Sequence, residues 1–401
     1  MLYRKIPKNN DMLSILEFGC MRLPLKGEVI DEERAIRQIR HAIDSGVNYV
    51  DTAWPYHAGQ SEPLLGKALK GGYRERVRVA TKLPSWIINC REDMDRFLAA
   101  QLKKLAIDRI DYYLVHALDG TLWDALVGHG VVDFLNRAKA DGRIVNAGFS
   151  FHGLGQDFKR IVDGYPWEFC QIQYSFLDEK NQAGTEGLKY AAAQNLGVIV
   201  MEPLRGGNLG RTVPPPAVEK IWNEAKIRRT PVEWALRWVW NHPEVTVVLS
   251  GMNEESHIAQ NLAIADSALP DSLNHNELEL VEKVSRKYQE LMKVPCTGCG
   301  YCMPCPSGVS IPICFETYNT MHMFGDPEHH KFLYAVRMSG ILIDGKPAYA
   351  SQCTECGQCL EKCPQHIQVP EFLAKVAEEM EGPEMEKRLA IAGPMFREEP
   401  K

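Results

Sequence analysis

Four side chains suited to acid–base chemistry stand at successive predicted strand ends. Asp51 closes the apolar run NYVD, and Tyr56 follows in the next loop. Lys82 comes after RVRVAT, and His116 comes after DYYLV. In parallel α/β proteins the carboxyl ends of the strands form the edge where chemistry takes place. Each residue alone has an ordinary structural explanation, such as a turn former or a solvated lysine, but together they predict an active site at that edge.

Two cysteine runs near the C-terminus form the second group of reactive side chains. The run from Cys353 to Cys363 has the spacing C-x2-C-x2-C-x3-C-P, which is typical of ferredoxins that hold [4Fe–4S] cubanes. The run from Cys296 to Cys305 is one residue shorter in its last gap. Zinc is the alternative for such runs. Because the fourth cysteine of each run serves the other cluster in two-cluster ferredoxins, the predicted ligand sets are Cys296, Cys299, Cys302 and Cys363 for one cluster and Cys353, Cys356, Cys359 and Cys305 for the other.

Alternating strand and helix patterns must position the four polar residues. Helix patterns such as Trp123–Ala140 lie between the strands. The predicted strands are Ile15–Leu23, Val47–Asp51, Val77–Lys82, Asp111–His116, Ile144–Phe149, Phe169–Tyr174, Gly197–Glu202 and Val245–Gly251. Eight strands that alternate with helices over about 250 residues predict a (β/α)8 TIM barrel. An open doubly wound sheet is the alternative, but no G-x-G-x-x-G motif follows the first strand. In a barrel, strands 2, 3 and 4 are neighbours, so the four side chains come together.

Composition and charge narrow the class of protein. The chain has 401 residues, of which 45% are hydrophobic and 24% charged, and this suits one large and one smaller domain. A net charge of -6 argues against nucleic-acid binding. No apolar stretch approaches the roughly 20 residues of a membrane span, and the N-terminus lacks the apolar core of a signal peptide. We expect a cytoplasmic protein with a barrel domain at 1–292 and a small, mainly helical iron–sulfur domain at 293–401, joined by the helix Glu277–Met292.

A long loop rich in Gly and Pro, Glu202–Ala217, follows the seventh predicted strand. It fits a mobile surface loop and a phosphate-binding loop equally well, because barrels often hold phosphate after strands 7 and 8. Gly206 and Gly207 would let the backbone approach a ligand closely.

The quartet, set in DTAWPYHAGQSE, ATKLP and YLVHAL, resembles the catalytic tetrad of the aldo-keto reductases. The resemblance covers roughly residues 14–265 and, with the cysteine runs, points to the branch fused to a ferredoxin-type 4Fe–4S domain. It implies an oxidoreductase that reduces an aldehyde or ketone to an alcohol with NADPH, with NADH possible.

The chemistry of the quartet agrees with this resemblance. Hydride addition to a carbonyl leaves an oxyanion, which Tyr56 can protonate. A free phenol has a pKa near 10, and we expect Lys82 to lower that value. Asp51 would hold Lys82, while His116 would donate a hydrogen bond to the carbonyl oxygen.

The resemblance also implies contacts with the nucleotide. Ser150 and Gln171 match positions that hold the nicotinamide carboxamide, and Met201 takes the place of a stacking aromatic residue. The remaining expected contacts lie in the loop after strand 7 and after strand 8, namely Leu204, Gly206, Gly251, Gln260 and Asn261. Gly251 and His257 stand where the family often has basic residues for the 2′-phosphate.

The alternative function is an iron–sulfur electron-transfer or redox-sensing protein whose barrel binds nucleotide without turnover. A nicotinamide gives up two electrons as a hydride, whereas a cubane accepts one electron at a time. We therefore expect the second domain to shape the substrate mouth or to dock a separate, ferredoxin-like redox partner.

Overall fold

The computed structural model describes the chain except for Glu28, Leu154, Thr297, Cys299, Tyr301, residues 342–345, 364–365 and 397–401, and the side chains of 394–396. Two compact units are present. The first consists of Met1–Thr212 and Ile227–Leu278, and the second of Val213–Lys226 and the chain from Glu279 onwards. The predicted domains were 1–292 and 293–401. The structure instead assigns Val213–Lys226 and most of α11 (His275–Glu290) to the second unit.

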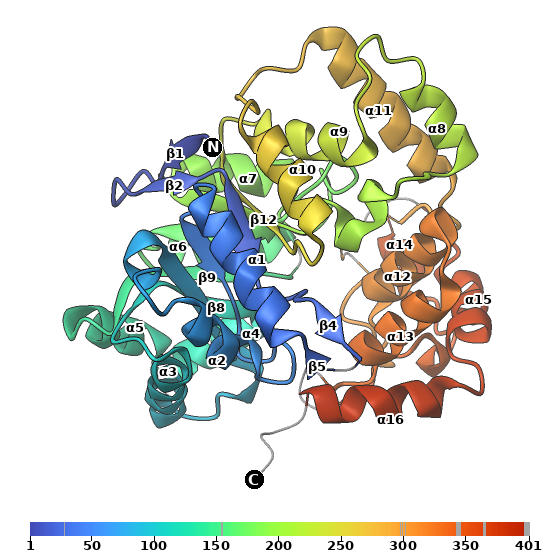
Figure 1. Cartoon of the computed structure of the whole chain (residues 1–401). Coiled ribbons are helices and arrows are strands. Elements are labelled where there is room, and N and C mark those ends of the chain that lie inside the picture. Colours follow the sequence, from blue (N-terminus) through green and yellow to red (C-terminus); the bar gives the residue numbers. More distant parts are fainter. Residues whose placement is uncertain are drawn as a thin grey trace. The chain divides into compact units, whose positions relative to one another are not determined.

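The first unit is a closed barrel of eight parallel strands, which confirms the predicted fold (Figure 1). Going around the barrel, the order is β10-β11-β12-β3-β6-β7-β8-β9. Their bounds are β3 Leu16–Gly19, β6 Tyr49–Asp51, β7 Arg78–Leu83, β8 Ile110–Leu118, β9 Ile144–Phe151, β10 Phe169–Gln173, β11 Gly197–Met201 and β12 Val245–Ser250. The predicted strand Ile15–Leu23 is too long, because the chain leaves the barrel after Gly19.

Large side chains fill the inside of the barrel. Tyr49, Tyr112 and Phe169 are fully buried there and pack edge to face, with ring centroids 5.1 and 5.0 Å apart in successive pairs. Gly148 on β9 makes room for them, because a Cβ at this position would lie 2.5 Å from the Phe169 ring. This packing makes the barrel a solid core that supports the upper ends of the strands.

Helices of the first unit follow the strands around the barrel (Figure 1). Their bounds are α1 Glu32–Asp44, α2 Ser61–Ala68, α3 Arg91–Leu105, α4 Gly120–Gly128, α5 Val131–Ala140, α6 Gly155–Asp163, α7 Gly184–Ala193, α9 Pro231–Trp240 and α10 Glu255–Ala265. The prediction of one helix over Trp123–Ala140 is wrong. Gly130 has a φ of 83° and separates α4 from α5, a conformation that glycine adopts without strain.

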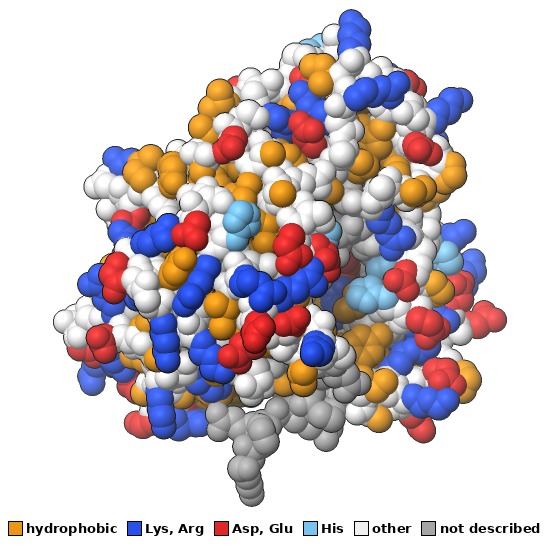
Figure 2. All heavy atoms as spheres, in the orientation of Figure 1, with side chains coloured by type: hydrophobic (Ala, Val, Ile, Leu, Met, Phe, Trp, Pro, Cys, Tyr) orange, Lys and Arg blue, Asp and Glu red, His pale blue; other side chains and the backbone are white. Residues whose placement is uncertain are grey.

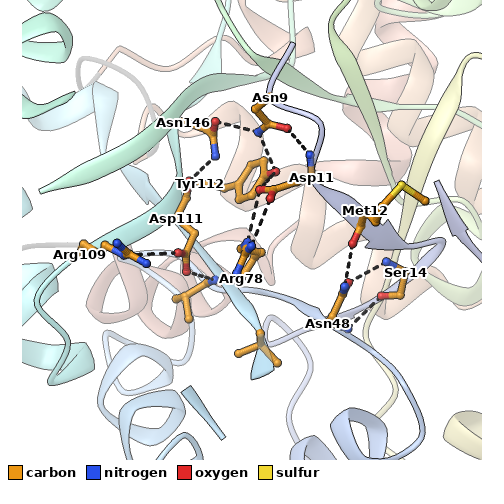
Figure 3. Close-up of polar contacts among 12 residues, drawn as sticks. Asn9, Asp11, Met12, Ser14, Asn48, Arg78, Arg109, Asp111, Tyr112 and Asn146 are labelled. Carbon is orange, nitrogen blue, oxygen red and sulfur yellow. Dashed lines mark hydrogen bonds and ion pairs between the residues drawn. The ribbon is translucent and has the colours of Figure 1, made fainter. Parts of the chain in front are cut away.

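Figure 3 shows a polar network at the N-terminal end of the barrel. The loop of a hairpin, β1 (Tyr3–Lys5) and β2 (Met12–Ser14), supplies Asn9 and Asp11. Asn9 donates to Tyr112 (3.0 Å) and Asn146 (2.8 Å), while Tyr112 donates to Asp11 (2.8 Å). These bonds tie the hairpin to β8 and β9 at the end opposite the predicted active edge.

The regular secondary structure in the described part of the second unit consists of helices, as predicted. Its core includes Phe315, Tyr318 and Leu373, and Tyr288 of α11 stacks on Phe324 with ring centroids 5.0 Å apart. The helices are α8 Pro216–Trp222, α11, α12 Ile311–Phe324, α13 Pro327–Met338, α14 Gln358–Lys362, α15 Val369–Met380 and α16 Met385–Phe396. The loop after β11 forms a short turn of helix, η3 (Arg205–Gly210), and then α8.

Acidic and basic side chains alternate over the face drawn in Figure 2. One such group joins α1 to α10, where Arg34 pairs with Glu254 at 2.6 Å and also with Glu255. None of the helices in the described ranges has the length and apolar character required to cross a bilayer.

Candidate functional site

Three neighbouring strands and one loop bring the predicted quartet together. Asp51 is the last residue of β6, and Lys82 lies near the end of β7, in the two strands that pair side by side. The Lys82 ammonium group bonds to the Asp51 carboxylate, donates to the Thr52 carbonyl oxygen at 2.9 Å and reaches the Tyr56 hydroxyl at 3.4 Å. Both charged side chains are 1% exposed, so the pair lies out of contact with water and directly behind the phenol.

The loop after β6 is anchored so that Tyr56 faces Lys82. Trp54 packs on Phe97 of α3 at 4.8 Å between ring centroids, and the Lys104 ammonium lies 3.5 Å from the Trp54 ring centroid. His57 has a φ of 51° and accepts a hydrogen bond from the Leu23 backbone at 3.1 Å. These contacts fix both flanks of the phenol.

A bulge in β8 sets the place of His116. The register of β8 against β9 shifts between Val115 and Leu118, and Ala117 has a φ of 52°. The Ala117 N–H donates to the Ser150 hydroxyl at 2.7 Å. The bulge turns the His116 ring towards Tyr56, with centroids 6.2 Å apart, and bulges of this kind re-aim side chains next to active sites.

Burial and charge set the protonation states of the quartet. Burial raises the pKa of Tyr56 to about 12, although the Lys82 charge lowers it. The expected lowering by Lys82 is therefore present, but desolvation outweighs it. Burial is the strongest single influence on the pKa of Lys82 and lowers it, but the opposing contributions, of which the Asp51 charge is the largest, together hold that pKa above its usual value. The site thus contains a neutral phenol beside a permanent cation.

His116 is a neutral imidazole. Burial lowers its pKa well below the usual value, and the charge of Lys82 acts in the same direction. A neutral ring has one N–H donor, which is what the proposed contact with a carbonyl oxygen requires. Trp86 borders the same ring, with centroids 5.2 Å apart, and was not singled out from the sequence.

The predicted carboxamide contacts lie side by side. Ser150 on β9 and Gln171 on β10 are paired in register, and both are 1% exposed. Met201 ends β11 and is 8% exposed. These three positions continue the edge that holds the quartet, so a nicotinamide ring placed there would lie beside Tyr56.

The remaining predicted nucleotide contacts surround the loop after β11. Leu204 precedes η3, and Gly206 within it has a φ of 69°. Arg22 lies against two of the predicted glycines, since a Cβ built on Gly206 or Gly251 would be 3.4 or 3.1 Å from its side chain. Sequence analysis did not identify Arg22, because no motif marks a basic residue that follows the first strand.

Two of the predicted nucleotide contacts lie on α10. Asn261 is buried and donates to the Ser250 hydroxyl at 3.0 Å. Gln260 donates to the Thr230 hydroxyl at 3.0 Å, which is the N-cap of α9. In this structure both amides are therefore engaged with the protein.

Five predicted iron ligands line one pocket in the second unit. Cys353, Cys356, Cys359 and Cys305 of one predicted set contribute to it, and so does Cys302 of the other set. Burial raises the pKa of the Cys359 thiol, and the charges of the other three cysteines of its set add to this effect. Cysteines of both runs therefore meet in this pocket, and the crossed assignment of Cys305 to the second run stays a prediction. The donor set fits a cubane, which four thiolates hold.

The described members of the other predicted set lie against one core. Cys296, Cys302 and Cys363 are partly buried and pack against the same apolar cluster of the second unit. The fourth predicted ligand, Cys299, lies outside the described residues. Cys314 is a fully buried member of that cluster, with its sulfur 3.7 Å from the Tyr334 hydroxyl and 3.6 Å from the Met338 sulfur.

A parallel barrel whose carboxyl edge carries an Asp, Tyr, Lys and His quartet is a known oxidoreductase architecture, and comparison with protein families agrees. Residues 16–281 match the aldo/keto reductase family, and residues 295–367 match the 4Fe-4S dicluster domain. The chain therefore belongs to the aldo/keto reductase family and carries a C-terminal dicluster domain.

Named relatives are similar along the barrel. A probable aldo-keto reductase 1 of Glycine max is 26% identical over 315 residues, which cover 68% of this chain and 86% of the relative. The NADH-specific methylglyoxal reductase of Escherichia coli (strain K12) is 26% identical over 330 residues, or 71% of this chain and 100% of the relative. The solved aldo-keto reductase AKR11C1 of Bacillus halodurans superimposes with a TM-score of 0.60 at 25% identity, covering 71% of this chain and 96% of that chain.

The buried ion pair predicts the behaviour of a Lys82→Met variant. Removing Lys82 leaves Asp51 buried without its counter-charge, which costs on the order of 3–5 kcal/mol. Burial alone then raises the folded-state pKa of Asp51 above its unfolded value. The free energy of unfolding should therefore fall as pH rises above about 4. Urea unfolding at pH 5 and pH 8, followed by tryptophan fluorescence, measures this.

The control is the double variant Lys82→Met with Asp51→Asn, which removes both charges. It should recover most of the lost stability and show no extra pH dependence. An equal loss at both pH values, or no recovery in the double variant, would contradict the assignment of the destabilisation to an unpaired Asp51.

Proposed function

We propose that this member of the aldo/keto reductase family reduces an aldehyde or ketone to an alcohol with a nicotinamide nucleotide. The bound nucleotide supplies the hydride. NADPH is the nucleotide we propose, with NADH as the alternative, and the ratio of kcat/KM for the two distinguishes them. The observation that carries the proposal is the Tyr56 hydroxyl, held 3.4 Å from a buried, charge-paired Lys82.

Each side chain of the quartet has a separate role in the proton transfer. Tyr56 stays protonated at neutral pH and gives its proton to the oxygen that becomes negative as the carbonyl is reduced. Lys82 stabilises the phenolate that remains, and Asp51 keeps Lys82 charged and in place. His116, neutral and partly buried, donates to the same oxygen and orients the carbonyl.

We infer the substrate class from the site and from similarity. Trp86 borders the imidazole of His116, with ring centroids 5.2 Å apart, so the carbonyl would meet an apolar side chain there. Since the chain is similar to a methylglyoxal reductase, methylglyoxal is the first compound for a panel of aldehydes and ketones. Oxidation of the reduced nucleotide, followed by its absorbance, reports turnover.

Tyr56→Phe should abolish turnover and leave nucleotide binding intact. The change removes only the proton-donating hydroxyl, so kcat should fall on the order of a hundredfold or more, while quenching of protein fluorescence by the nucleotide persists. Tyr190→Phe is the control, because Tyr190 bonds to Asp163 on the surface. Near-normal turnover by Tyr56→Phe would remove Tyr56 as the general acid.

For the second unit, we propose that the eight cysteines of the two runs hold two [4Fe–4S] clusters. The convergence of Cys305 with the second run supports this proposal. The clusters would each need one thiolate from the opposite run, so that neither run completes a site alone.

Anaerobically purified protein should contain on the order of eight iron atoms per chain, and Cys305→Ala about four. Iron and acid-labile sulfide analysis measures this. Cys314→Ala is the matched control, because Cys314 is a buried thiol of the same unit that contacts Tyr334 and Met338. It should keep its full iron content. A wild-type content near four, or zinc in place of iron, would overturn the proposal.

We propose that the clusters do not take part in the hydride step but exchange electrons with a separate, ferredoxin-like carrier. Hydride transfer moves two electrons together, and a cubane accepts one. Stopped-flow mixing of oxidised protein with NADPH under argon should leave the cluster absorbance unchanged on the timescale of turnover. Bleaching as fast as turnover would place the clusters in the reaction path instead.

A further inference from the structure

Glu17 is a carboxyl group sealed inside the barrel. It lies on β3 and is 0% exposed. Neither of its carboxyl oxygens hydrogen-bonds to another described residue. A buried carboxyl without a partner costs several kcal/mol when it is ionised, so this position in an otherwise apolar strand requires an explanation.

The strand register places Glu17 next to the ion pair. Phe18 of β3 is paired with Val50 of β6, and Gly19 with Asp51. Alternate residues of a strand share a face, so Glu17 lies on the same face as Asp51 and one step below it. Both side chains therefore project into the barrel interior from adjacent strands, and the Asp51 charge acts on Glu17.

The surroundings of Glu17 favour its protonated form. Burial raises its pKa well above the usual range, and the Asp51 charge raises it further against the opposing effect of Lys82. A protonated carboxyl has one O–H donor. In a dry interior that donor needs an acceptor.

Asp51 offers the matching acceptor. Its Oδ1 atom is bound by Lys82, whereas Oδ2 has no hydrogen-bond partner in the described part of the chain. The Gln171 amide lies close enough to lower the pKa of Asp51, but that amide is also the predicted contact for the nicotinamide carboxamide. With nucleotide bound, Glu17 is then the donor left for Oδ2.

We propose that Glu17 is a positioning residue of the hydride-transfer site, whose carboxyl proton is donated to the free oxygen of Asp51 and so fixes the Asp51–Lys82 pair behind Tyr56. The turnover part of this proposal rests on the proposed carbonyl reduction. The protonation part does not, because it concerns the resting protein.

Other titratable groups around Glu17 do not provide this partner. The groups whose electrostatics couple to it are Asp51, Lys82, Tyr49, Tyr56 and Cys20. Tyr49 and Cys20 are fully buried, and burial raises their pKa values well above the usual range, so both stay neutral. The field around Glu17 therefore comes from the Asp51–Lys82 pair.

Infrared spectroscopy of wild type and Glu17→Gln tests the protonation directly. At neutral pH the exposed carboxyls are ionised, so a remaining C=O band of protonated carboxyl reports buried groups. Glu17→Gln should remove one such band and leave the rest of the spectrum unchanged. An unchanged spectrum would overturn the proposal even if the protein reduces no carbonyl.

The pH dependence of kcat distinguishes a positioning role of the Glu17 side chain from a role that only fills space in the core. The amide of Glu17→Gln can still donate to Asp51, so kcat should stay within about threefold and the alkaline limb of the profile should not move. Glu17→Leu fills similar space without a donor, so kcat should fall about tenfold. Its alkaline limb should move to higher pH, because Asp51 then keeps its full charge and opposes ionisation of Tyr56.

The opposite hypothesis, an ionised Glu17, makes a different prediction. Glu17→Gln would then remove a negative charge that raises the pKa of Tyr56, and the alkaline limb would move to lower pH. That result would overturn the proposal. If Glu17→Leu does not fold, the spectrum and pH profile of Glu17→Gln decide by themselves.

Discussion

The ion pair of Lys82 and Asp51, closed off from water inside a barrel, is the interaction on which the rest of the site depends. A lysine that is 1% exposed remains charged only because a carboxylate lies against it. The cation in turn stands behind a phenol and near a neutral imidazole. The barrel holds this pair in place. Its two charged residues lie on adjacent strands in fixed register, and Tyr49, Tyr112 and Phe169 pack the barrel interior.

The sequence was sufficient to predict the barrel and the meeting of the quartet, because strand order in a closed parallel sheet turns succession along the chain into proximity. It was not sufficient for features that depend on a single backbone angle. Gly130 interrupts an apolar pattern that would otherwise continue as one helix. The bulge at Ala117, which aims His116, likewise leaves no mark in composition or spacing.

The protonation of buried side chains was the other feature that the sequence alone could not predict. That Lys82 favours the phenolate of Tyr56 follows from chemistry alone, but the larger opposing effect of burial depends on how deeply the loop packs. Glu17 carried a visible signal, a charged residue within the apolar run SILEFGC. The strand register suggests a role for this residue, because it puts Glu17 on the same face as Asp51 of the adjacent strand. In the second unit, by contrast, the cysteine spacing predicted that both runs would come close together, and the structure brings Cys302 and Cys305 to one pocket with Cys353, Cys356 and Cys359.

The route of the chain through the two units bears on how such a protein could have arisen. The chain enters the second unit at Val213, returns to the barrel at Ile227 and leaves it again after Leu278. Val218 and Trp222 of the inserted segment are buried in the complete protein. The second unit is therefore assembled from two separate stretches of the chain, so that a deletion removing it whole would have to take out part of the loop after β11 as well as the C-terminal stretch.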